Sequence, residues 1–152
     1  MTAKKEKGIS LEFRISNIEL IEKSFHIPLP KGNSFSNPQF ELAINVSVDK
    51  PNKSIINILG VNVKSADDNS IVASIKVLCK FEITNFEDVV MFSDDLITIP
   101  DPIIETLNII TIGTTRGIMF NEFKGTWLHN TILPVIDPKS FKQENEKQVS
   151  MP

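Results

Sequence analysis

The sequence contains few of the residues from which catalytic and metal sites are usually built. It has one cysteine and two histidines among 152 residues. A single cysteine excludes an intramolecular disulfide, and two histidines without cysteine neighbours make a poor metal site. The sequence also lacks an HExxH, CxxC, GxSxG, P-loop or dinucleotide-binding motif. We therefore predict that the protein is not an enzyme and uses neither a cofactor nor a metal ion.

Strong charge and long apolar runs are absent as well. A net charge of -3 at pH 7 gives no electrostatic basis for binding nucleic acid. No apolar run reaches the roughly 18 to 20 residues that cross a bilayer. The opening residues MTAKKEKG lack the apolar core of a secretory signal. These absences predict a cytoplasmic protein that neither binds nucleic acid nor inserts into a membrane.

Length and composition predict one folded domain. The hydrophobic fraction of 41% and the charged fraction of 23% are ordinary, and 152 residues are enough to bury a sizeable core. Residues 1–10 and 143–152 are mostly polar or charged and have no regular apolar spacing. We therefore expect a flexible tail at each end of a single domain that covers residues 11–142.

Alternation of apolar and polar residues predicts four strands, at residues 11–27, 40–48, 54–65 and 71–83. In the first strand the apolar phase shifts near Asn17, which predicts a bulge, and it shifts back before Phe25. Turn-forming residues separate the later strands. The pattern predicts a four-stranded antiparallel meander with one apolar face, and that face needs a cover.

One long helix is predicted after the sheet. Asp101 and Pro102 are typical of a helix start, because Asp can cap free N–H groups and Pro is favoured at the first helical position. The apolar residues between Ile103 and Phe123 fit a helical face, although the β-branched residues at 109–115 leave a strand as a competing prediction. A second Asp-Pro pair at residues 137–138 predicts a short final helix.

Several short motifs resemble the SecB family of export chaperones. They are Thr114-Thr115-Arg116-Gly117, the Phe and Gly-Thr that follow, the segment 133–138 with Phe141, and Glu22-Lys23-Ser24-Phe25 with Pro28. The resemblance covers nearly the whole chain, from about residue 11 to residue 141. It implies an α+β fold, in which a four-stranded antiparallel sheet is covered by one long helix, with a loop and a short C-terminal helix. It also implies a homotetramer built as a dimer of dimers.

The predicted helix is apolar on more than one side. Helices of this kind are usually buried on more than one side, so we predict oligomerisation through this helix, with a monomer whose helix is well covered as the alternative. The predicted interface residues are Ile109, Ile112, Gly113, Arg116, Met119 and Phe120.

Aromatic residues and methionines are concentrated in segments outside regular structure. Core packing is the simplest explanation for any one of them, but as a set they suit an adaptable apolar groove. The resemblance implies that unfolded client chains are held in grooves formed by the sheet, the loop and the final helix. The predicted client-binding residues are Phe35, Phe86, Met91, Phe92, Phe123, Trp127, Leu128, Ile132 and Leu133.

These features together predict an ATP-independent chaperone, a holdase, that keeps unfolded preproteins competent for export. In the SecB family, acidic residues of the first and fourth strands bind the translocation motor SecA. Glu22 matches one such position and Glu19 lies near it, whereas His26 stands where a further acidic residue is expected. Two alternatives stay open: a SecB-like chaperone dedicated to one partner such as an antitoxin, and a non-chaperone module that binds an apolar ligand.

Overall fold

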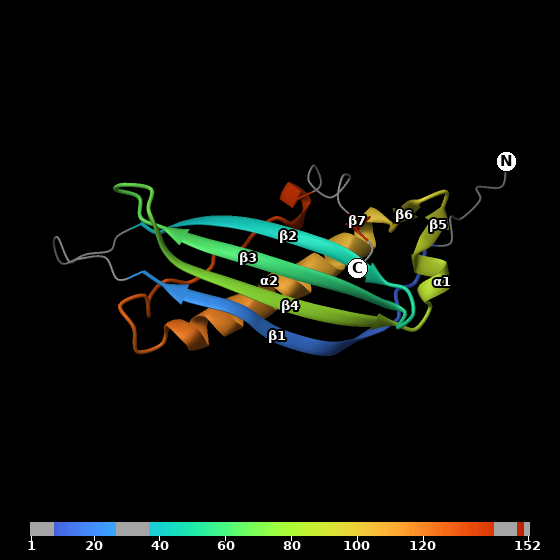
Figure 1. The fold of residues 1–152 in the computed structure, drawn as a ribbon, viewed down its shortest axis with the longest axis horizontal. Coiled ribbons are helices and arrows are strands. Elements are labelled where there is room, and N and C mark those ends of the chain that lie inside the picture. Colours follow the sequence, from blue (N-terminus) through green and yellow to red (C-terminus); the bar gives the residue numbers. More distant parts are fainter. Residues whose placement is uncertain (1–7, 27–36, 142–148, 151–152) are drawn as a thin grey trace.

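The computed structural model describes residues 8–26, 37–141 and 149–150. Its main sheet contains four long strands, β1 (Phe13–Phe25), β2 (Gln39–Asp49), β3 (Ser54–Lys64) and β4 (Ile71–Ile83). They lie in the order β1-β4-β3-β2, and each neighbouring pair is antiparallel. The predicted meander is wrong for β1, which pairs with β4 and not with β2, because alternation along a strand does not determine which strand it pairs with. The long helix α2 (Asp101–Phe123) crosses one face of this sheet obliquely (Figure 1). The predicted α+β architecture is confirmed.

Shorter elements complete the fold. They are α1 (Phe86–Val89), the hairpin of β5 (Met91–Ser93) and β6 (Leu96–Thr98), the 3-10 helix η1 (Pro138–Phe141) and β7 (Val149–Ser150). The predicted final helix is therefore a single 3-10 turn. β7 lies within the segment 143–152 that the sequence assigned to a tail, and it pairs with β2 in parallel as a fifth strand. Across the residues that the structure describes, no helix is long and apolar enough to cross a membrane.

Two bulges interrupt the pairing of β1 with β4. The register shifts between Ile15 and Asn17 and again between Leu20 and Glu22. These are the places where the apolar phase of the sequence changes, so both predicted irregularities are confirmed. Because each bulge adds one residue, β1 can turn apolar side chains toward the helix at both of its ends despite the broken alternation.

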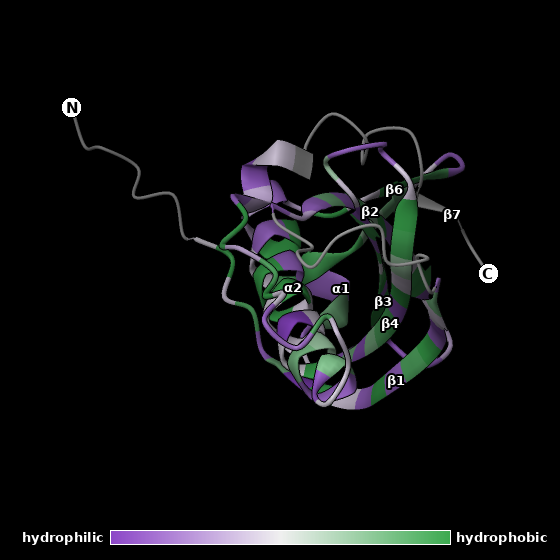
Figure 2. Ribbon diagram, turned by 90° about the vertical axis from the view of Figure 1, so that its left-hand side faces the viewer, coloured by the Kyte–Doolittle hydropathy of each residue, from purple (hydrophilic) through white to green (hydrophobic). Residues whose placement is uncertain are grey.

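The core lies between the sheet and α2, and the opposite face of the sheet is open (Figure 2). Alternate residues of β2, β3 and β4 are buried against the helix, in two apolar clusters that occupy the two ends of the sheet. A buried polar seam accompanies them: the Asn57 amide donates to Asn108 Oδ1 at 2.9 Å and to Thr111 Oγ1 at 3.3 Å. The side-chain oxygen Oδ1 of Asn57 accepts no hydrogen bond from any described residue.

The helix α2 runs unbroken through the β-branched segment 109–115. Thr111 and Thr115 donate their hydroxyl hydrogens to the carbonyls of Leu107 and Thr111, and both threonines are buried against the sheet. Tertiary burial therefore outweighs the low helix propensity of these residues. The predicted cap was wrong: Pro100 is the N-cap, and Asp101 is the first residue of the helix. Asp101 still places negative charge near the positive end of the helix dipole.

A single helix is too narrow to cover this sheet. Three strand spacings separate the outer strands by about 14 Å, whereas a helix with its side chains is about 10–12 Å across. The segment between α2 and η1 covers one end of the apolar face, where Leu128 and Leu133 join the core. The short helix α1 covers the other end with Phe86 and Val89. Segments that read as irregular in the sequence therefore complete the core.

Candidate functional site

Four of the predicted client-binding residues are buried. Phe86, Phe123, Leu128 and Leu133 are each at most 1% exposed, because α1, α2 and the following loop use them to close the core. The prediction that these four residues line an open groove was wrong, because a client cannot reach their buried side chains. Phe35 lies outside the described residues.

The remaining predicted residues lie on two separate surfaces. Met91 and Phe92 are exposed on the β5–β6 hairpin, together with Leu96, which the sequence analysis missed. The Phe92 ring lies 6.2 Å from that of Phe86 and carries the Lys50 ammonium 4.3 Å from its centroid. The hairpin is thus tied to the core on one side and to the end of β2 on the other.

The second surface lies along the loop that follows α2. Trp127 is partly exposed, Ile132 is 55% exposed, and Val135 is 93% exposed. We call Ile132 and Val135 the loop patch. Val135 was not among the predicted residues, although the prolines on both sides of its apolar segment could have indicated that this stretch leaves the core.

Arg116 fixes the backbone that carries the loop patch. Its Nε donates to the Leu133 carbonyl at 2.7 Å, and its Nη2 donates to the Pro134 carbonyl at 2.8 Å. Hydrogen bonds from a charged donor are among the stronger ones in proteins. Arg116 was predicted to lie in an oligomer interface, but its side chain donates hydrogen bonds to the loop of its own chain. Arg116 therefore links the backbone next to Ile132 and Val135 to α2.

An open cavity of about 580 Å³ lies where the loop begins, and its lining is Phe120, Lys124, Gly125, Thr126, His129 and Asn130. Gly125 has a φ of 78°, a backbone conformation that suits glycine and allows the chain to turn back after the helix. Thr126 stabilises the turn by donating to the Phe123 carbonyl at 2.7 Å. The cavity combines one exposed aromatic ring with polar groups and contains no carboxylate.

The outward face of α2 carries part of the predicted oligomer interface. Ile109 and Phe120 are 54% and 56% exposed, and Gly113 lies between them with open space around its Cα. Ile112 and Met119 are buried in this chain's own core, so they cannot contact a second copy. Their assignment to the interface is corrected by that burial, since the helix stripe facing the sheet is wider than the sequence indicated.

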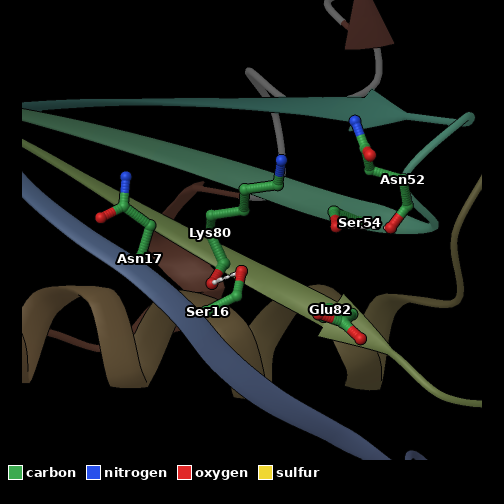
Figure 3. Close-up of a pocket in the computed structure, with 6 residues that line it drawn as sticks. All are labelled: Ser16, Asn17, Asn52, Ser54, Lys80 and Glu82. Carbon is green, nitrogen blue, oxygen red and sulfur yellow. Dashed lines mark hydrogen bonds between the residues drawn. The ribbon is translucent and has the colours of Figure 1, made fainter.

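The open face of the sheet is mainly polar, with Ile56, Ile58 and Leu78 half-buried among its polar residues. Its cavity of about 480 Å³ is lined by Ser16, Asn17, Asn52, Ser54, Lys80 and Glu82 (Figure 3). Lys80 reaches across the face and donates to Asp49 Oδ2 at 3.1 Å. Hydrogen bonds from the Asn52 side chain and from Lys80 lower the pKa of Asp49. Lys80 and Asp49 neutralise each other, and the pairs Lys76–Glu22 and Lys64–Glu41 lie on the same face.

The predicted motor-binding residues lie on the same open face. Glu22 is paired with Lys76 at 3.3 Å, and Glu19 is exposed on β1 opposite Leu78. The fourth strand presents Lys76 and Lys80 where the resemblance would require acidic residues. A continuous acidic surface is therefore not formed by these residues, and motor binding stays a prediction.

Chemically reactive groups are few. Cys79 is buried on the helix side of β4, and burial raises the pKa of its thiol. Asp68 accepts two hydrogen bonds from Ser70 within its turn. Among the described residues, no three His, Cys, Asp or Glu side chains come together as a metal site.

Comparisons with known proteins agree with this geometry at the level of the fold. No family model matches the sequence, and no curated protein matches it. Among solved structures, the chain is similar to the Mycobacterium tuberculosis Rv1957 SecB-like chaperone in complex with a ChAD peptide from the Rv1956 HigA1 antitoxin. The TM-score is 0.53 and the identity 10%, over 82% of this chain and 90% of that chain. The protein therefore has a SecB-like fold.

Proposed function

We propose that this protein is an ATP-independent chaperone of the cytoplasm that holds extended apolar segments of client polypeptides. The observation that carries the proposal is the loop patch, in which apolar side chains are kept exposed by the Arg116 anchor. Burial of such side chains by a client supplies binding free energy of about 25 cal/mol per Å². The proposal involves no catalytic step and no cofactor. Likeness to a SecB-like chaperone solved with a bound peptide supports it.

Several chains acting together would strengthen weak individual sites. We propose that copies associate through Ile109, Gly113 and Phe120 on the outward face of α2, in a tetramer as the family resemblance implies. Exposed apolar side chains and a glycine that permits close approach support this contact. Multiple client sites in one assembly raise overall affinity without any stronger single contact.

A chaperone dedicated to one partner is the second candidate. Pairing of Glu22 with Lys76 weakens the case for docking to SecA, and with it the case for a general role in preprotein export. The similar mycobacterial chaperone was solved with a peptide from an antitoxin, which makes an antitoxin-like partner a reasonable alternative here.

The test is suppression of aggregation of two unrelated, chemically unfolded proteins, followed by light scattering without nucleotide. We expect suppression at stoichiometric amounts by an assembly of four 17.0 kDa chains. The double variant Ile132→Ser, Val135→Ser should lose at least about half of the effect, since it removes the apolar area of the loop patch. Ile9→Ser is the matched control, because Ile9 is also exposed but lies far from the loop in sequence.

The outcomes separate the candidates. Suppression of both unfolded proteins supports a general holdase. Suppression of neither, combined with tight binding of a single peptide, supports a dedicated chaperone. A monomer that leaves aggregation unchanged and binds no peptide would contradict the proposal and would favour an apolar-ligand module.

A further inference from the structure

The outer edge of β2 already carries a strand in this protein. Val46 pairs with Val149 and Ser47 with Ser150, both in parallel, so that β7 extends the sheet beyond β2 (Figure 1). A strand edge exposes a row of N–H and C=O groups that pair readily with another extended chain. β7 uses this edge at only two residues of a strand that runs from Gln39 to Asp49.

The rest of β2 is suited to the same kind of pairing. Its register with β3 is unbroken from Gln39 to Asp49, and no proline interrupts it. A regular strand keeps its outward backbone groups evenly aligned, which is what an added strand requires.

The two sides of this edge differ in polarity. On the helix side, Phe40 and Leu42 are half-buried against the same core cluster as Ile136 of the loop. On the open side, Glu41, Ala43 and Asn45 are exposed. Because successive residues of a strand point to opposite faces, a chain added here would turn alternate side chains toward apolar and polar surroundings. The edge therefore fits an extended segment in which apolar and polar residues alternate.

The end of this protein's own sequence has that pattern. Gln148-Val149-Ser150-Met151 alternates polar and apolar residues, and two of these residues form β7. The chain's own terminus thus has the same sequence pattern as the segment that the edge is suited to bind.

We propose that the outer edge of β2 is a docking site for one extended client segment, an inference that rests on the proposed function. Apolar and polar residues alternate in this segment, and it pairs with β2 in parallel. β7 occupies part of this site in the free protein and leaves when a client binds. Competition of this kind lowers the apparent affinity for the client in proportion to the fraction of chains in which the edge is free. The terminus then acts as an internal competitor that rejects weakly binding segments.

The first experiment measures binding of a fluorescein-labelled peptide with the sequence of residues 145–152 by fluorescence anisotropy. It compares the full chain with a chain that ends at Gln148 and lacks β7. We expect the shortened chain to bind the peptide at least about tenfold more tightly, since the tethered terminus competes at high effective concentration in the full chain. A circular dichroism spectrum checks that the shortened chain is folded.

A modified peptide tests for backbone pairing. Methylation of the backbone nitrogens of Val149 and Ser150 removes N–H donors that a parallel strand uses and leaves the side chains unchanged. We expect at least about a tenfold loss of affinity, corresponding to loss of strand pairing. Equal binding of the methylated and unmodified peptides would overturn the proposal.

The second experiment uses reduced, carboxymethylated lactalbumin as the unfolded client. We expect the shortened chain to bind it about threefold or more tightly than the full chain, and excess terminal peptide to compete with it. Equal binding by both chains, unaffected by the peptide, would overturn this proposal and leave the proposed function standing. Binding of the peptide without any binding of lactalbumin would overturn the client part of this proposal together with the proposed function.

Discussion

The two outer strands of the four-stranded sheet have different edges. β1 is bulged at two places, and its charged residues Arg14, Glu22 and Lys23 are each engaged in an ion pair. β2 keeps one register along its whole length and has β7 paired to it. Bulges and charged side chains are the usual means by which proteins prevent a strand from being added to an edge. The β1 edge is therefore protected from strand pairing, and the β2 edge is open to it.

The two edges also differ in what covers them. β1 is attached to α2 by the Lys23–Glu122 pair at 2.6 Å and by the Phe25 and Phe123 rings at 5.6 Å. The β2 side is covered by a loop that Arg116 holds through two hydrogen bonds. Apart from Leu128, Thr131 and Leu133, the side chains of this loop are exposed or half-buried. Segments of this kind open more readily than core helices. The contacts between β1 and α2 are therefore the more rigid ones, and those between the loop and the β2 side are the more adaptable ones.

The largest effect is expected at the attachment of β1. Phe123→Ala removes a buried ring that contacts Phe25, and it should lower the free energy of unfolding by about 3–5 kcal/mol. Asn121→Ala, at an exposed position of the same helix outside the proposed contact between copies, should change it by no more than about 0.5 kcal/mol. Urea unfolding measures both. Similar losses of unfolding free energy for the two variants would show that Phe123 does not lie on the buried side of α2.

The next largest effect concerns the cover at β2. Arg116→Ala removes both hydrogen bonds to the loop, and we expect a loss of about 2 kcal/mol with faster hydrogen exchange at residues 131–136. Arg14→Ala is the control, because the Arg14–Glu82 pair is exposed and contributes at most about 1 kcal/mol. If exchange in the loop stays unchanged, the loop is held by its buried leucines rather than by Arg116.

A smaller effect should appear in self-association. Ile15 and Ile18 lie on the helix side of β1 but are 43% and 47% exposed. They form a second apolar surface, besides the proposed contact through Ile109, Gly113 and Phe120 of α2, that another copy is able to bury by side-chain packing. Ile18→Ser should weaken association roughly tenfold, as expected for the loss of one buried aliphatic side chain. Sedimentation at several concentrations measures this. Ile71→Ser, at an exposed site on β4, is the control, and an equal effect of both variants would count against a β1 contact.

The smallest effect is a pH dependence at the end of β2. Asn52 and Lys80 lower the pKa of Asp49 in the folded protein, so Asp49 stabilises the fold above its unfolded pKa of about 3.9. This contribution is lost as the pH falls through the lower folded value. The urea midpoints of the wild type and Asp49→Asn should therefore converge between pH 6 and pH 2.5. A constant difference over that range would mean that Asp49 acts without its charge.

The sequence was informative where structure depends on local alternation. The phase shifts around Asn17 and before Phe25 predicted both bulges, because a bulge changes which residues face the core. The helix start was predicted less accurately. The sequence indicated Asp101 as the N-cap, but the N-cap is Pro100, one position earlier, because the backbone conformation decides which residue precedes the first helical turn. The strands were therefore predictable from short segments alone. For the long helix, the β-branched residues at 109–115 left a strand as a competing prediction, which the family resemblance decided.

Burial in irregular segments was not predictable in this way. Phe86, Leu128 and Leu133 read as exposed groove residues, but the width of the sheet relative to α2 forces them into the core. Val135 is exposed because Arg116 fixes the neighbouring backbone, a contact between residues distant in sequence. β7 has only two residues and no periodicity to reveal it. These features depend on how elements fit together, and alternation carries no information about that fit.

The seam of Asn57, Asn108 and Thr111 limits how the molecule can change shape. If α2 slid along the sheet by one turn, Ile104 or Ile112 would replace Asn108 beside the Asn57 amide and leave its donors buried without a partner. The helix thus has one permitted longitudinal position. Arg116, eight residues farther along α2, is positioned with it. Accommodation of differently shaped partners must then come from the loop, the β5–β6 hairpin and the end of the chain, while the helix and sheet stay in fixed alignment.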